Sequence, residues 1–141
     1  TRAAGDILKE QKKNTTDDRK KIENLHKMVR LAYTLKEELL HNNIDAMGDI
    51  LHQGWMYKKE LAGGISNELI NRYYDLAMQN GASGGKLLGA GGGGFLLFYV
   101  KEENHERVRH ALRDLKELKF KFDNKGTTII HYNKHSLRGE F

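Results

Sequence analysis

The sequence predicts an α+β domain in which helices pack on a small mixed or antiparallel sheet. Apolar residues recur at helical spacing through the first half of the chain, and short apolar or β-branched runs separated by turn residues follow. Segregated helices and strands are typical of the α+β class. With 141 residues and 38% hydrophobic content, the chain is long enough for one domain with a buried core.

The N-terminal part predicts three helices. A short helix is expected over residues 2–11, a long amphipathic helix over 19–41 and a further helix over 44–61. The polar segment between the first two helices offers three candidate N-caps, namely Thr15, Thr16 and Asp17. Trp55 lies on the apolar side of the third helix, and we interpret it as a core anchor rather than a stacking platform.

Another helix is expected after a hinge at Gly63-Gly64. Ser66 is its predicted N-cap, and Ile65 and Ile70 fit a hydrophobic staple across that cap. Asn80-Gly81 supplies a stop signal. The residues predicted to face the core are Leu69, Ile70, Tyr73 and Ala77.

The glycine-rich segment 84–94 is the most informative part of the sequence. Seven of its eleven residues are glycines, and an apolar run over 95–100, expected to be a buried strand, follows at once. Glycine loses much conformational entropy on folding, so a dense cluster needs a reason. The reason is either positive φ angles in consecutive turns or close approach of backbone N–H groups to a phosphate. Both a structural turn without ligand and a phosphate-binding loop remain open.

Spacing and context exclude two common phosphate loops. Gly89, Gly91 and Gly94 match the G-x-G-x-x-G pattern, but the dinucleotide fingerprint needs a strand before the glycines and a helix after them. Here we expect a helix before the segment and a strand after it. A P-loop is excluded because Asn80 stands where its first glycine is needed, and Leu87 where its Ser or Thr is needed.

The C-terminal part predicts one helix and two strands. Asn104 is the candidate N-cap of the helix, whose apolar residues are Val108, Ala111, Leu112 and Leu115. Strands are expected over 119–122 and 127–132, followed by a loose tail or an edge over 133–141.

Composition narrows the functional classes. The net charge is +5, but charges of both signs are interspersed, which favours a solvated surface over a nucleic-acid or membrane partner. The lack of cysteine excludes disulfides, thiolate metal sites and a Cys nucleophile, and is compatible with the cytoplasmic location that we expect. His105 and His110 are five residues apart and do not share a helix face, and His131 and His135 are four apart but fall at a predicted strand, so we expect no metal site.

The segment Lys86-Leu87-Leu88-Gly89-Ala90-Gly91-Gly92-Gly93-Gly94-Phe95 resembles the third conserved motif of the GHMP kinases (galactokinase, homoserine kinase, mevalonate kinase and phosphomevalonate kinase). That motif runs roughly Lys-x-Ser/Thr-Gly-Ala-Gly-Gly-Gly-Gly and lies between a helix and a strand. Leu88 departs from it, because many members have a hydroxyl residue there. Residues 1–8 resemble the start of the family's C-terminal domain in its sugar-phosphate branch, so the resemblance covers nearly the whole chain.

The resemblance implies a ferredoxin-like C-terminal domain over residues 1–141, belonging to a kinase that uses ATP and Mg²⁺ to phosphorylate a sugar or sugar phosphate. It implies phosphate-proximal roles for Lys86, Gly89, Ala90, Gly91, Gly92, Gly93 and Gly94. It also suggests that Arg2 contacts the substrate.

The family's main ATP-phosphate loop, Mg²⁺ ligand and catalytic Asp belong to an N-terminal domain. No Pro-x-x-x-Gly-Leu-Gly-Ser-Ser-Ala motif occurs here, since the chain has no proline. We therefore expect no catalytic residue in this chain. Together with the start at Thr1, this predicts a fragment that needs its own N-terminal domain and is inactive alone.

A free-standing α+β module that binds a small ligand or RNA is the alternative. RNA binding by a sheet needs exposed aromatic side chains on the strands. Phe120 and Phe122 alternate with Lys119 and Lys121, the one interleaving of this kind, but they share one face and are expected to pack against helices. The sequence leaves the oligomeric state open.

Overall fold

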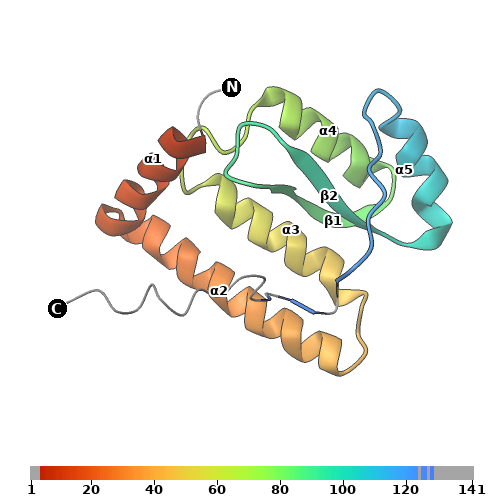
Figure 1. Cartoon of the computed structure of the whole chain (residues 1–141), viewed down its shortest axis with the longest axis horizontal. Helices are drawn as coiled ribbons and strands as arrows, with labels where there is room; N and C mark the ends of the chain where they lie inside the picture. Colours follow the sequence, from red (N-terminus) through yellow and green to blue (C-terminus); the bar gives the residue numbers. More distant parts are fainter. Residues whose placement is uncertain (1–3, 124, 127, 129–141) are drawn as a thin grey trace, which may run out of the picture.

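The computed structural model describes residues 4–123, 125, 126 and 128. Its elements are α1 (Ala4–Asp17), α2 (Arg19–Leu40), α3 (Ala46–Lys59), α4 (Glu68–Gln79), β1 (Ala82–Leu88), β2 (Phe95–Val100), the 3₁₀ helix η1 (Glu102–Asn104) and α5 (His105–Ala111). The hairpin of β1 and β2 lies between α3 and α4, and α2 packs on the other side of α3 (Figure 1). The predicted α+β class is confirmed.

The first helix is longer than predicted, so its candidate caps lie inside it. Thr15 and Thr16 donate their hydroxyl hydrogens to carbonyls one turn earlier, which satisfies them within the helix. Asp18 caps α2 instead, since its carboxylate accepts hydrogen bonds from the amides of Lys20 and Lys21 at 2.9 and 3.3 Å. The boundary between the two helices is therefore one residue beyond the predicted caps.

The cap of α4 is also one residue later than predicted. Asn67 Oδ1 accepts a 2.9 Å hydrogen bond from the Ile70 amide, which makes Asn67 the N-cap. The Ser66 hydroxyl donates to Asn71 Oδ1 instead.

The core-facing side of α4 differs from the predicted one. Ile70, Tyr74 and Ala77 are buried at helical spacing, whereas Leu69 is 59% exposed and Tyr73 is half-buried. The largest fully buried side chains of the described part are Trp55, Leu61, Ile65, Tyr74 and Leu87. Trp55 is 1% exposed and thus belongs to the core, as predicted.

The glycine-rich segment begins with a strand that the sequence analysis did not predict. Residues 82–88 form β1, which pairs antiparallel with β2 from Ala82↔Val100 to Leu88↔Phe95. The expectation that a helix directly precedes the glycine loop is therefore wrong, because the loop closes a hairpin. A dinucleotide fold stays excluded, since an antiparallel strand and not a helix follows. The strand over 95–100 is confirmed but only half-buried, and Phe95 is 58% exposed.

Two glycines of β1 are required by close packing. A Cβ on Gly84 would overlap the carbonyl oxygen of Gly48 in α3, and a Cβ on Gly85 would overlap the carbonyl oxygen of Leu97 in β2. Gly48 is equally constrained, because its Cβ would lie 2.5 Å from Ser83 Cβ. The backbones of α3 and β1 are thus in direct contact at these residues.

The C-terminal part departs most from the prediction. Asn104 makes no side-chain cap bond, and α5 ends at Ala111, so Leu115 lies beyond the helix. Residues 119–122 form no strand, and Phe120 and Phe122 are 61% and 82% exposed, so the expectation that they pack against helices is wrong. The segments 127–132 and 133–141 lie outside the described residues, apart from Thr128. No helix within the described ranges is long and apolar enough to cross a membrane.

Candidate phosphate site

The loop from Gly89 to Gly94 has a backbone that only glycine adopts readily. The φ angles are +97° at Gly89, +125° at Gly91, +74° at Gly92 and +126° at Gly94. Side chains of L-residues rarely tolerate this region, so four of the loop glycines are explained by conformation alone. This is the structural reason that the sequence analysis kept open.

The loop is seated on the turn before α4 and on α1. The Gly92 amide donates a 3.0 Å hydrogen bond to the carbonyl of Ile65, a fully buried residue. A Cβ on Gly91 would lie 2.5 Å from Ile65 Cα, and one on Gly92 would lie 3.2 Å from Ile7 Cδ1. The loop is therefore fixed in position by contacts on its inner side.

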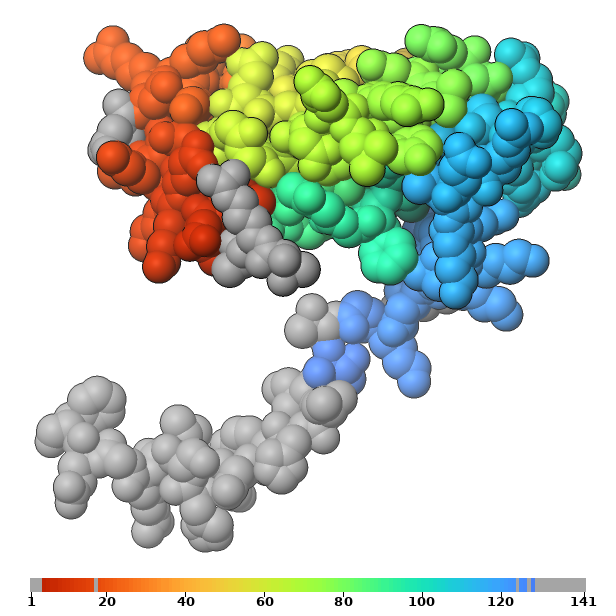
Figure 2. All heavy atoms as spheres, turned by 90° about the horizontal axis from the view of Figure 1, so that it is seen from above, coloured from red at the N-terminus to blue at the C-terminus, as the bar shows by residue number. Residues whose placement is uncertain are grey.

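Gly93 is different from its neighbours. Its φ is not in the positive region, and a Cβ at this position would meet no described atom within 4 Å. Gly93 is exposed, and the amides of Ala90, Gly91 and Gly93 have no acceptor in the part of the chain that the structure describes. The hairpin tip is open at the surface near α1 (Figure 2). Free amides and an unfilled glycine position are typical of a loop that an anion approaches closely.

Two lysines lie beside the loop. Lys86 is on β1, on the face opposite Leu87 because strand residues alternate, and this is the face on which α3 packs through Gly84. Lys58, in the last turn of α3, donates a 2.6 Å hydrogen bond from Nζ to the carbonyl of Gly89. The glycine motif predicted a role for Lys86, whereas nothing in the sequence around Lys58 pointed to the loop.

The surroundings of Lys58 disfavour its positive charge. Burial lowers the pKa of its ammonium group, and the positive charge of Lys86 lowers that pKa further. Neither lysine forms an ion pair with a described carboxylate. The positive charge at this end of the hairpin is therefore not neutralised by the described residues.

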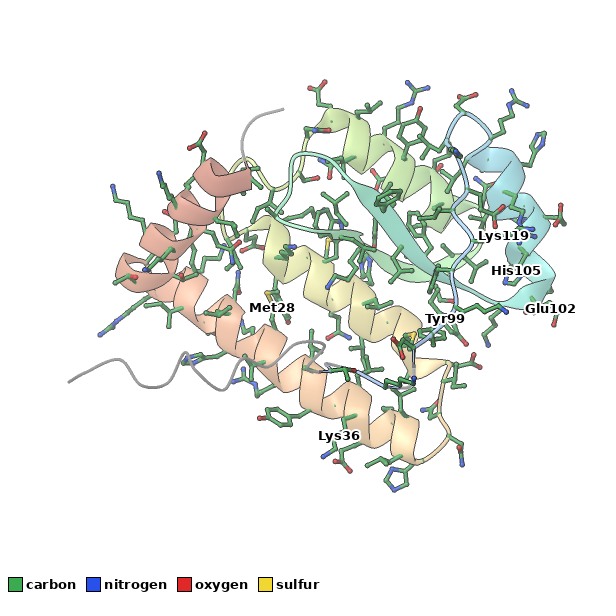
Figure 3. The ribbon with its side chains drawn as sticks, viewed as in Figure 1. Met28, Lys36, Tyr99, Glu102, His105 and Lys119 are labelled. Carbon is green, nitrogen blue, oxygen red and sulfur yellow. The ribbon has the colours of Figure 1, made fainter. Side chains whose placement is uncertain are left out.

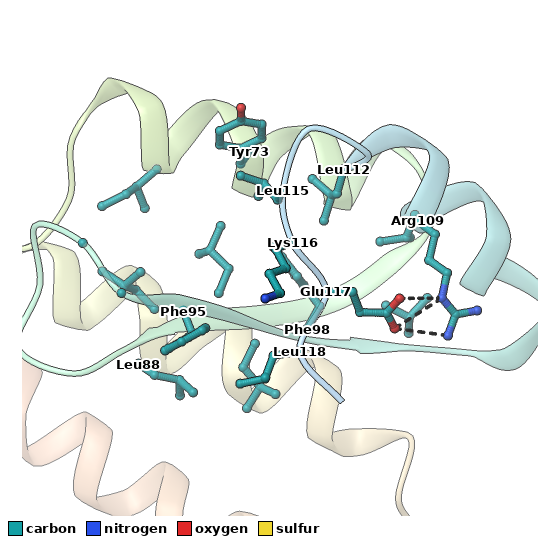
Figure 4. Close-up of a pocket in the computed structure, with 18 of the residues that line it drawn as sticks. Tyr73, Leu88, Phe95, Phe98, Arg109, Leu112, Leu115, Lys116, Glu117 and Leu118 are labelled. Carbon is teal, nitrogen blue, oxygen red and sulfur yellow. Dashed lines mark hydrogen bonds and ion pairs between the residues drawn. The ribbon is translucent and has the colours of Figure 1, made fainter. Parts of the chain in front are cut away.

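A large apolar groove meets the loop at one end only. It has a volume of about 1080 Å³, lies between the hairpin, α4, α5 and the segment 115–120, and includes Gly92, Gly93 and Gly94 in its wall (Figure 4). Glu117 of that segment is tied to α5 by a 3.2 Å ion pair with Arg109. Neither lysine lines the groove, so the groove reaches the loop glycines but not the two ammonium groups.

The other candidate residues do not join this site. Arg2, His131 and His135 lie outside the described residues. His105 hydrogen-bonds through Nε2 to the carbonyl of Val100 at 3.0 Å, and His110 is exposed. Among the residues described, no group of three or more His, Asp or Glu side chains is placed to hold a metal ion.

Residues 35–117 match the family model of the GHMP kinases C-terminal domain. The chain belongs to the GHMP kinase family. The matched range includes α3, α4, the hairpin with its loop, and α5, so the resemblance seen in the glycine motif extends to the whole scaffold of the site.

Two curated relatives support this membership. The chain is 38% identical over 113 residues to D-glycero-alpha-D-manno-heptose 7-phosphate kinase of Campylobacter jejuni, a match that covers 80% of the chain and 33% of the relative. It is 34% identical over 104 residues to the bifunctional fucokinase/GDP-fucose pyrophosphorylase of Arabidopsis thaliana. This match covers 73% of the chain and 10% of that relative. The chain thus spans a third or less of the length of these relatives.

Proposed function

We propose that this chain is the C-terminal domain of an ATP-dependent sugar kinase whose acceptor is a heptose 7-phosphate. The observation that carries the proposal is the glycine loop, which has open amides, an unfilled position at Gly93 and two lysines beside it. Family membership supports the proposal that this loop is one wall of a phosphotransfer site. The heptose is supported by the similarity to the Campylobacter jejuni enzyme.

Phosphoryl transfer needs positioning and neutralisation of charge more than covalent chemistry by the protein. In the proposed site the loop amides lie against phosphate oxygens, and Lys86 attracts the phosphate groups. Bound ATP supplies the γ-phosphoryl group, and Mg²⁺ offsets part of its charge. Arg2 is proposed as a contact of the sugar phosphate, because a guanidinium forms paired hydrogen bonds with phosphate.

The proposal includes an N-terminal domain of the same protein as the main partner of residues 1–141. The ligands of Mg²⁺ and the catalytic Asp are proposed to lie there, as the membership of the GHMP kinase family suggests. A cytoplasmic location is part of the proposal because ATP is a cytoplasmic substrate. A free-standing binding module is disfavoured, because both curated relatives continue far beyond the matched region.

The test uses the intact protein that contains this chain and measures ADP formation with purified sugars. We expect ATP consumption that depends on D-glycero-D-manno-heptose 7-phosphate, and no turnover by the 141 residues alone. Turnover with fucose but not with the heptose phosphate would show that the proposed acceptor sugar is wrong. A lack of ATP consumption with either sugar would contradict the kinase proposal.

A second experiment tests the proposed contact between Arg2 and the sugar phosphate. In the intact protein, Arg2→Ala is expected to raise the KM for the sugar phosphate by about tenfold, since a charge-assisted hydrogen bond is lost. The matched control is Arg30→Ala on the exposed surface of α2, which removes the same charge elsewhere. An unchanged KM in the first variant would reject the role of Arg2.

A further inference from the structure

Lys58 and Lys86 bring two positive charges to the side of the hairpin that faces α3. Lys58 is anchored to the first loop residue through the carbonyl of Gly89, and Lys86 is close enough to lower the pKa of Lys58. Two ammonium groups side by side repel each other unless an anion offsets the charge. No described carboxylate pairs with either lysine, so the described residues do not offset the charge of the pair.

The fold brings Lys58 to the loop. The helix α3 follows β1 along its length, because Gly48 contacts Gly84 at one end and Lys58 contacts Gly89 at the other. The ten residues from Gly48 to Lys58 rise about 15 Å along the helix, and the five from Gly84 to Gly89 span about 17 Å along the strand. The two distances are similar, so both contacts can form at once. The direct backbone contact at Gly48 thereby fixes where the ammonium group of Lys58 is placed.

The hydrogen-bonding capacity of the pair is largely unused. An ammonium group has three donors, and the described partner of Lys58 is the carbonyl of Gly89. Lys86 donates to no described acceptor, and the amides of Ala90 and Gly93 are also free of described acceptors. A phosphoryl group offers several strong acceptor oxygens and a negative charge, which matches this set of donors.

We propose that Lys58 and Lys86, beside the first residue of the glycine loop, bind one phosphoryl group of a substrate. The inference rests on the proposed kinase function and deepens it by adding Lys58 to the site. The phosphoryl group belongs either to the acceptor sugar phosphate or to ATP. Both sources present the same oxygens, and kinetics separates them.

The experiment uses the intact protein with Lys58→Gln, Lys86→Gln and the double variant. Glutamine keeps a donor for the Gly89 carbonyl but removes the charge, so an effect of Lys58→Gln reports on the anion and not on the anchoring of the loop. The matched control is Lys36→Gln, which removes one charge from α2, beyond α3 as seen from the hairpin (Figure 3).

If the pair binds the acceptor phosphate, each single variant raises the KM for the sugar phosphate by about tenfold while the KM for ATP stays unchanged. If it binds a phosphate of ATP, the KM for ATP rises, or kcat falls by a similar factor. Either outcome supports the site and names its ligand. If the KM for the sugar phosphate, the KM for ATP and kcat all remain within twofold of the Lys36→Gln values, the proposed site is overturned.

A binding measurement keeps the inference separate from the kinase function. Pyrophosphate is titrated into the native and double-variant proteins, with chloride at equal ionic strength as the reference, and the melting temperature is followed. The native protein is expected to be stabilised more than the double variant, in which only phosphate sites elsewhere in the intact protein remain. Equal stabilisation of both proteins would overturn the lysine site, even where the native protein shows no kinase activity. Greater stabilisation of the native protein supports the site in that case too.

Discussion

The strand part and the loop part of the glycine segment use the same residue for different physical purposes. In β1, Gly84 lacks a positive φ, and its missing side chain allows the carbonyl of Gly48 to touch the strand. In the loop, Gly91 needs a positive φ of 125° in addition to the close approach of Ile65. Gly93 has neither constraint among the described residues. A dense glycine cluster therefore combines packing, conformation and an unfilled surface, and substitutions can separate these three uses.

The largest loss of stability is expected where the backbones of α3 and β1 are in contact. Gly84→Ala should lower the free energy of unfolding by about 3 kcal/mol, because a methyl group would have to displace backbone atoms rather than a flexible side chain. Urea denaturation followed by fluorescence measures the change, since Trp55 is the single tryptophan and is 1% exposed.

The control for this variant is Gly54→Ala in the same helix α3. Its Cβ would meet Leu31 Cδ1 at 3.8 Å, an ordinary contact, and alanine is favoured over glycine in a helix by about 1 kcal/mol. Gly54→Ala should therefore be neutral or stabilising. If Gly84→Ala were as stable as Gly54→Ala, the direct contact between the backbones of α3 and β1 would be refuted.

The second largest effect is expected in the loop. Gly91→Ala should destabilise the chain by about 2 kcal/mol, because alanine pays for a left-handed φ and its Cβ would approach Ile65. The same denaturation measurement applies. Gly93→Ala is the matched control and should change stability by less than about 0.5 kcal/mol. Equal losses in both variants would mean that the loop constrains both positions alike.

The sequence predicted the elements whose signal is local. The helix α2 was found within one residue of its C-terminal end because its apolar residues repeat over several turns. β1 was missed because glycine is depleted in strands. The contact that explains Gly84 is with Gly48, which is distant in the chain. Lys58 was missed for the same reason, since its contact with Gly89 spans 31 positions. The loop itself was found because consecutive glycines are a local signal.

The third prediction concerns function at the one loop position without a structural constraint. If the proposed function holds, Gly93→Ala in the intact protein should lower kcat/KM by about tenfold, because the added methyl group would occupy the space through which the proposed phosphate approaches the loop amides. Steady-state kinetics with ATP and the sugar phosphate measures it, and the unchanged stability expected above shows that the fold is intact. Native kcat/KM in this variant would mean that the phosphate does not approach at Gly93.

The smallest change in stability is expected at Tyr74, whose hydroxyl group hydrogen-bonds to the backbone of β1. It donates a 3.3 Å hydrogen bond to the carbonyl of Gly85 and shares a 2.8 Å hydrogen bond with His52 Nδ1. Burial raises the pKa of Tyr74 from 10 to about 12. A raised pKa in the folded state means that the neutral phenol is favoured by folding, so this contribution is complete below pH 10 and is lost as the pH rises toward 12.

Tyr74→Phe isolates this contribution from the lysines and other groups that titrate in the same range. The variant should be less stable than the native chain by about 1 kcal/mol at neutral pH, because the hydrogen bonds of the hydroxyl are removed. The difference should then shrink between pH 10 and 12, since the native chain alone has to ionise a buried phenol. Urea denaturation at several pH values measures it, and a difference that stays constant to pH 12 would show that the hydroxyl under β1 is not sheltered from solvent.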